Sequence, residues 1–142
     1  MSIIDDAILQ LQTHALALST PSQKIKSAPA HPVNDANVLP LAIAHIIEGS
    51  GQADEATTAR LLLTVGVDFH LSRVTLKHAY GEIDKIIPEF LQRLAGDPTL
   101  GSTVDTIIFP VTFTVTPADW GSVITQAVFF RVPLKFREDP IT

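Results

Sequence analysis

The 142 residues carry a formal net charge of −5, which argues against a nucleic-acid clamp, because such a surface needs clustered Lys and Arg. The chain has no cysteine, which excludes disulfides and thiolate metal sites. This length, with 46% hydrophobic and 18% charged residues, predicts one globular domain over residues 1–142 with a lightly charged surface. We expect no signal peptide and no membrane-spanning segment, because no basic leader and no sufficiently long apolar run occurs.

The first 38 residues predict a helix followed by a proline-rich irregular segment. Within residues 2–18, apolar residues recur at spacings of three and four, which places Ile4, Ile8, Leu11, Ala15 and Leu18 on one helix face. Ser2 is positioned to cap this helix. Residues 19–38 contain three prolines, which exclude a long regular element.

Two strands are predicted next, over residues 39–48 and 60–71, with a polar loop at residues 49–58. In the second strand every other residue is apolar: Leu61, Leu63, Val65, Val67, Phe69 and Leu71. Strict alternation over this length predicts a strand with one buried face and one solvated face.

Residues 76–95 change to a helical period. The apolar stripe consists of Leu76, Tyr80, Ile83, Ile87, Phe90, Leu91 and Leu94. It stays in phase across Pro88, which favours one kinked helix over two helices. We expect Gly96 to adopt a positive φ and end this helix, and Asp97-Pro98 to begin a turn.

Two long strands complete the predicted fold, over residues 106–116 and 124–136, with a turn at residues 117–121. Pro110 and Pro133 each remove a backbone donor and are expected at bulges or edges. The order α-β-β-α-β-β predicts an α+β domain with a mostly antiparallel sheet and two main helices packed on it. Residues 1–38 form its N-terminal part, and residues 39–137 form the sheet and second helix.

The sequence contains no recognisable catalytic motif, so no catalytic, cofactor-binding or metal-binding residue is predicted. Gly-x-Ser-x-Gly and phosphate-binding glycine motifs do not occur. Asp68 and His70 share one face of a strand, which would suit a base or a metal ligand. We favour a solvated strand face, because no third ligand has recognisable spacing. His45 falls on the apolar parity of its strand, which predicts that it and His70 lie on opposite faces.

Four residues are candidates for a subunit or partner interface. Asp54 and Glu55 lie in the predicted polar loop, and Asp97 lies in the turn after the second helix. Trp120, the only Trp, lies in the turn between the last two strands. The large indole side chain of Trp120 either anchors a partner or folds back over the sheet edge.

Several segments, taken in order, carry a resemblance to one family. They are Leu39-Pro40 at the start of a strand, the strand 60–71 followed by Arg73, the helix with Pro88, the run Leu94-Ala95-Gly96-Asp97-Pro98-Thr99-Leu100-Gly101 leading into residues 104–115, and Val132-Pro133-Leu134. Over residues 38–136 the chain resembles the tail-terminator proteins of long, non-contractile-tailed bacteriophages. These are minor tail proteins that cap the tail tube.

The resemblance implies a virion protein of the tail that is not an enzyme and is assembled in the cytoplasm of the host bacterium. Such a protein forms a homo-oligomeric ring, commonly of six subunits, on the last ring of tail-tube protein. The ring stops tube polymerisation and presents the surface that meets the head-completion or connector protein. An acidic ring suits the passage of DNA without specific binding, because like charges repel.

Three alternatives stay open. The first is a neck or head-completion protein of the same virion. The second is a small hydrolase or metalloenzyme built on His45, Asp68 and His70. The third is a ligand-binding domain of the host, for which a monomer with a deep apolar cavity is expected.

Overall fold

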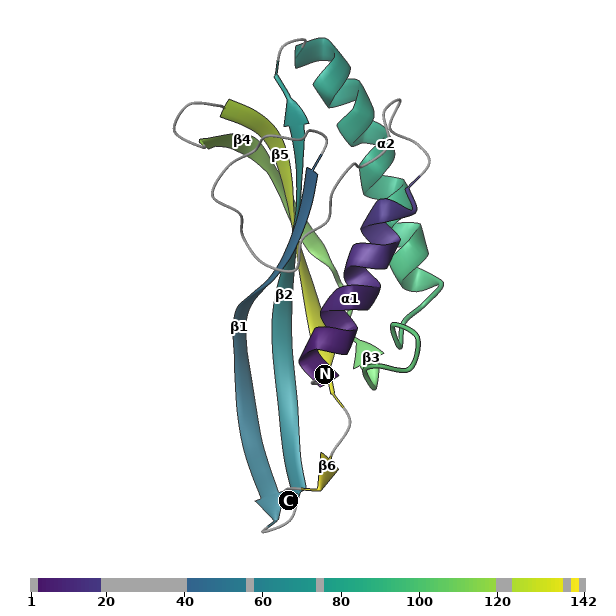
Figure 1. Ribbon diagram of the computed structural model, residues 1–142, viewed down its shortest axis with the longest axis vertical. Helices are drawn as coiled ribbons and strands as arrows, with labels where there is room; N and C mark the ends of the chain where they lie inside the picture. Colours follow the sequence, from purple (N-terminus) through teal and green to yellow (C-terminus); the bar gives the residue numbers. More distant parts are fainter. Residues whose placement is uncertain are drawn as a thin grey trace.

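Two helices lie against one face of an antiparallel sheet (Figure 1). The computed structural model describes residues 3–18, 41–55, 58–73, 76–119, 124–136 and 139–140. The helices are α1 (Ile3–Leu16) and α2 (Leu76–Ala95). The strands are β1 (Leu41–Glu55), β2 (Thr58–Ser72), β3 (Thr106–Ile107), β4 (Thr112–Asp119), β5 (Ile124–Lys135) and β6 (Asp139–Pro140). The predicted helix at the start of the chain is confirmed, whereas Ser2 and residues 19–40 lie outside the described part.

The strands follow the order β1-β2-β5-β3, while β4 also pairs with β5 and β6 pairs with β2. Each of these pairings is antiparallel. The predicted α+β class with an antiparallel sheet is therefore confirmed. β5 lies in the interior of the sheet, although it is the last long strand of the chain.

The alternation in β2 predicts the core face correctly. Five of its apolar residues are buried against the helices: Leu63, Val65, Val67, Phe69 and Leu71. The ring of Phe69 lies 5.1 Å from that of Phe90 in α2 and 5.7 Å from that of Phe130 in β5. These edge-to-face contacts join helix and sheet at the centre of the core.

The buried face of α2 is rotated relative to the predicted stripe. It consists of Ala79, Glu82, Ile83, Ile86, Phe90 and Leu94, whereas Leu76 and Tyr80 are exposed. The prediction was wrong for these two residues because it counted large apolar side chains and overlooked Ala79, which lets the helix approach the sheet closely. The helix continues through Pro88, so a single helix is confirmed.

The predicted polar loop at residues 49–58 is wrong. β1 continues to Glu55 and β2 begins at Thr58, which makes a long hairpin. Pairing with the strongly strand-forming β2 outweighs the low strand propensity of Gly49 and Gly51. The register shifts between Ile46 and Glu48, which is the mark of a bulge, and the side-chain alternation of β1 changes there.

The predicted strand over residues 106–116 is two strands, β3 and β4, and both pair with β5. The break contains Pro110, which has no backbone N–H to donate. Pro133 lies in β5 next to this break, and its carbonyl accepts a hydrogen bond of 2.8 Å from the Ile108 N–H. β4 runs to Asp119, so the predicted turn at residues 117–121 is wrong for residues 117–119.

The expected positive φ at Gly96 is also wrong. The left-handed residues are Leu100, Gly101 and Ser102, with φ of 46°, 64° and 68°. The Gly96 N–H still donates to the Gln92 carbonyl in a helical hydrogen bond of 3.0 Å. The turn does begin at Asp97, as predicted, because its carbonyl accepts from the Leu100 N–H at 3.0 Å.

Replacing Gly101 by Val is expected to lower the free energy of unfolding by about 1–3 kcal/mol, because a branched residue is strained at this φ. A Cβ there would also lie 3.2 Å from Gln10 Cδ. Gly96→Ala is the matched control and should cost nothing, because its Cβ would make ordinary contacts of 3.5 Å or more. Urea unfolding of both variants checks this, and equal losses would contradict it.

Candidate functional site

The four candidate interface residues lie in different parts of the fold. Asp54 and Glu55 lie at the end of β1, near the tip of the β1–β2 hairpin. Asp97 lies in the turn after α2, and Trp120 lies outside the described residues. The described members therefore do not form one cluster, and each surface is considered separately below.

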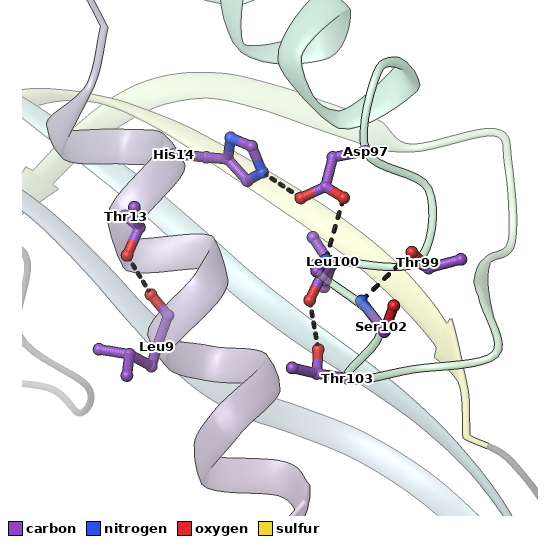
Figure 2. A network of polar contacts seen from close by, with 9 residues as sticks. Leu9, Thr13, His14, Asp97, Thr99, Leu100, Ser102 and Thr103 are labelled. Atoms are coloured by element: carbon purple, nitrogen blue, oxygen red, sulfur yellow. Dashed lines mark hydrogen bonds and ion pairs between the residues drawn. The ribbon is translucent and has the colours of Figure 1, made fainter.

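Asp97 connects α1 to the turn, as Figure 2 shows. The His14 Nε2–H donates to Asp97 Oδ2 at 2.8 Å, and the Gly101 N–H donates to Oδ1 at 3.0 Å. The Gly101 hydrogen bond is the main reason that the pKa of Asp97 lies below its ordinary value, and His14 adds to this. Both carboxylate oxygens have partners within the chain, so the residue positions the turn against α1.

A polar cluster lies on the sheet face opposite the helices. The His45 Nε2–H donates to Asp68 Oδ2 at 2.8 Å. The parity argument that separated His45 from His70 was wrong. The register pairs His45 with Gly66 and Leu41 with His70, and direct cross-strand partners project to the same face. The apolar residues Leu41 and Ile43 occupy this second face, so hydrophobicity alone pointed to the wrong side.

His70 is buried, with 3% of its surface exposed, so the expected solvated face is wrong here. Its Nδ1 and the buried Thr125 hydroxyl share a hydrogen bond of 2.9 Å. Burial, and secondly the charge on His45, lower the pKa of His70 to about 4. Burial raises the pKa of Asp68, although its hydrogen bond to His45 acts in the opposite direction.

Gly66 makes room for this cluster. A Cβ at Gly66 would lie 2.8 Å from Ile47 Cδ1 and 3.0 Å from His45 Nε2. Asp68 hydrogen-bonds to His45, and His70 hydrogen-bonds to Thr125. Across the described ranges, no three His, Asp or Glu side chains gather as metal ligands would. The arrangement fixes β1, β2 and β5 relative to one another.

The β1–β2 hairpin carries exposed apolar side chains. Figure 1 shows its outer end extending beyond both helices. Ile46, Ile47 and Leu62 are all exposed, and Ile46 keeps half of its surface accessible. An open groove of about 370 Å³ crosses the hairpin and its neighbours; it is lined by Glu48, Gly49, Ser50, Leu62, Leu63, Thr64, Ile108, Pro133 and Leu134. It is an open groove on the surface.

A second apolar surface lies at the opposite edge of the sheet. Phe109 and Phe113, next to and in β4, are exposed, as is Ile108, which also lines the groove described above. Five of the eight β4 residues are Thr, Phe or Val, and only Asp119 is charged. Edge strands usually carry charges that prevent pairing with another chain, and β4 has one only at its end.

No family model matches the chain, and no curated protein matches its sequence. Neither helix in the described ranges is long and apolar enough to cross a membrane.

Proposed function

We propose that this chain is a structural assembly protein that forms a closed ring of identical subunits. The observation that carries the proposal is the pair of apolar surfaces on different edges of one sheet. Ile47 and Leu62 are exposed on the face of the β1–β2 hairpin opposite the helices, and Ile46 is exposed on its other face, whereas Phe109 and Phe113 are exposed next to and in β4. Exposed apolar surface of this kind marks protein interaction sites.

Two different surfaces on one subunit suit a head-to-tail contact. Such contacts generate rings when the rotation between subunits closes, whereas a twofold dimer uses the same surface twice. The strand directions agree with this arrangement. β1–β2, β2–β5 and β5–β4 are all antiparallel, so β1 runs antiparallel to β4 within one subunit. A neighbour rotated about an axis parallel to the strands keeps this direction and presents its β1 antiparallel to β4.

We further propose that the ring caps the tail tube of a long, non-contractile-tailed bacteriophage, as the sequence resemblance implies. In this role it stops tube polymerisation and offers a surface to the head-completion or connector protein. The net charge of −5 supports a ring through which DNA passes without specific binding. The protein would be a component of the virion tail, assembled in the bacterial cytoplasm.

The test is a length-control assay with tail-tube protein of the same phage or prophage. Tubes polymerised with this chain are expected to be shorter and blocked at one end, because a cap prevents further addition. Electron microscopy measures tube length, and light scattering measures the mass of the chain alone and after mixing.

A chain that stays monomeric and leaves tube length unchanged would contradict the tail-terminator proposal. If that chain instead binds head connectors, it is a neck or head-completion protein. A small molecule bound stoichiometrically by a monomer would favour the ligand-binding domain.

A further inference from the structure

β4 forms one edge of the sheet. It pairs with β5, and no second strand pairs with it among the residues that the structure describes. Its side chains from Thr112 to Thr114 are exposed, and no charged residue precedes Asp119 within the strand. An exposed edge without charges is a template for pairing with a strand of another chain.

The hydrogen bonds of β5 show which backbone groups of β4 point away from the sheet. On the β2 side, the Phe136 N–H donates to the Leu61 carbonyl. On the other side, the Pro133 carbonyl accepts from the Ile108 N–H. Because backbone groups alternate sides along a strand, the odd-numbered residues of β5 turn theirs toward β4. These groups bond the even-numbered residues of β4, which are Thr112, Thr114, Thr116 and Ala118.

Phe113, Val115 and Pro117 consequently present their backbone groups to the open edge. Phe113 and Val115 each offer an N–H and a carbonyl, whereas Pro117 has no N–H to donate. Two β4 strands that meet antiparallel about a twofold axis can therefore use every one of these N–H groups and their carbonyls in one register. In that register Phe113 of one copy lies opposite Val115 of the other, and four hydrogen bonds form.

The same register matches the side chains of the two strands. On the helix face, each copy places the aromatic ring of Phe113 beside the β-branched Val115 of the other. On the opposite face, Thr114 lies across from Thr114 of the second copy, and Thr112 lies across from Thr116. Cross-strand pairs of both kinds stabilise antiparallel sheets.

The surroundings of β4 leave room for a second copy of this strand. Phe113 keeps 43% of its surface exposed, although its ring lies 5.7 Å from that of Phe130 in the core. The two Asp119 side chains lie at opposite ends of the paired strands, so like charges do not meet. The other long edge strand, β1, has a register shift between Ile46 and Glu48 that interrupts a comparable ladder, which favours a second β4 as the partner.

We propose that two copies of the free chain pair through their β4 strands in this register and form one continuous sheet about a twofold axis. The dimer is weak, because one pair of strands buries little surface compared with a standard interface. It covers Phe113, which the proposed ring also uses, so the dimer and the ring contact exclude each other. The dimer is then a resting form that separates when the chain caps a tube, and this consequence alone rests on the proposed function.

Disulfide cross-linking of the full-length chain tests the register, because the chain has no cysteine of its own. In Thr114→Cys the two thiols face each other across the axis with Cα atoms about 4.5 Å apart, a separation that a disulfide spans. We expect a covalent dimer on mild oxidation. Thr112→Cys is the matched control, since its side chain is also exposed but its two copies lie about 14 Å apart along the strands. Equal cross-linking of both variants, or none in Thr114→Cys, overturns the proposal.

Two charged variants, Thr114→Lys and Thr114→Glu, test the same contact without a covalent bond. Each alone is expected to dimerise at least about tenfold more weakly than the wild type, because like charges then lie opposite each other. A 1:1 mixture should regain dimerisation, because position 114 then faces the opposite charge. Sedimentation velocity measures the dimer, and circular dichroism checks that both variants keep the wild-type fold. Dimerisation that is lost in both variants and does not recover on mixing shows that position 114 does not face itself, and the proposal is wrong.

The length-control assay separates the dimer from the proposed function. A chain that caps tubes but gives no Thr114→Cys cross-link overturns the dimer and leaves the ring intact. A chain that forms the dimer but never caps tubes contradicts the proposed function and leaves the dimer intact. The oxidised Thr114→Cys dimer should fail to cap tubes until a reductant separates it. If the oxidised dimer caps tubes as well as the reduced chain does, the dimer is not a resting form.

Discussion

Replacing Val65 by Asp is expected to leave the chain unfolded under native conditions. Val65 is fully buried in the middle of β2, on the face that packs against the helices. The variant loses the free energy gained by burying the valine side chain, and it places an unpaired carboxylate in the core, which costs several kcal/mol. That cost is comparable to the whole stability of a typical domain, about 5–15 kcal/mol.

The measurement is near- and far-UV circular dichroism with urea unfolding. The matched control is Leu62→Asp, on the same strand but with its side chain exposed, which should fold. A cooperative transition of wild-type strength in V65D would contradict the assigned core face.

The second large effect is a loss of stability on mild acidification. The native pKa of His70 is about 4 and its ordinary value is 6.5, so the unfolded chain takes up the proton first. The stabilising contribution is fully present above pH 6.5 and is lost as the pH falls toward 4. Between pH 7 and pH 5 this difference in proton uptake lowers the free energy of unfolding by about 2 kcal/mol.

His70→Gln should show a shallower decline over this range, while His78→Gln, whose side chain lies on the surface of α2, should keep the wild-type slope. The raised pKa of Asp68 acts in the opposite direction, because the native state retains that proton more strongly than the unfolded chain. Comparing the slopes of the free energy of unfolding against pH between the wild type and the two variants isolates the contribution of His70. Equal slopes in all three proteins would show that His70 does not remain neutral.

The sequence predicts local elements well where one pattern dominates. The alternation from Leu63 to Leu71 identifies β2 and its buried face, and the α1 face is confirmed at Ile8, Leu11 and Ala15. The hairpin beyond Gly49 was missed, because its residues become a strand only through pairing with β2. We predicted a left-handed conformation at Gly96, whereas residues 100–102 adopt it. The Gly101 N–H donates to the Asp97 carboxylate, and this contact places the chain reversal after residue 97.

The polar cluster could not be assembled from the sequence alone. Its two pairs depend on the β1–β2 and β2–β5 registers, which join residues far apart in the chain. One signal was available: Gly66 interrupts a strand otherwise rich in large residues, and such a glycine often marks close packing.

The interior position of β5 governs when the fold can complete during synthesis. β2 has its second partner only after Ile124–Lys135 has been made, and β3 and β4 pair with β5 alone. Until then the nascent chain exposes an unpaired edge of β2 and most of the core. A product truncated before β5 thus loses the centre of its sheet.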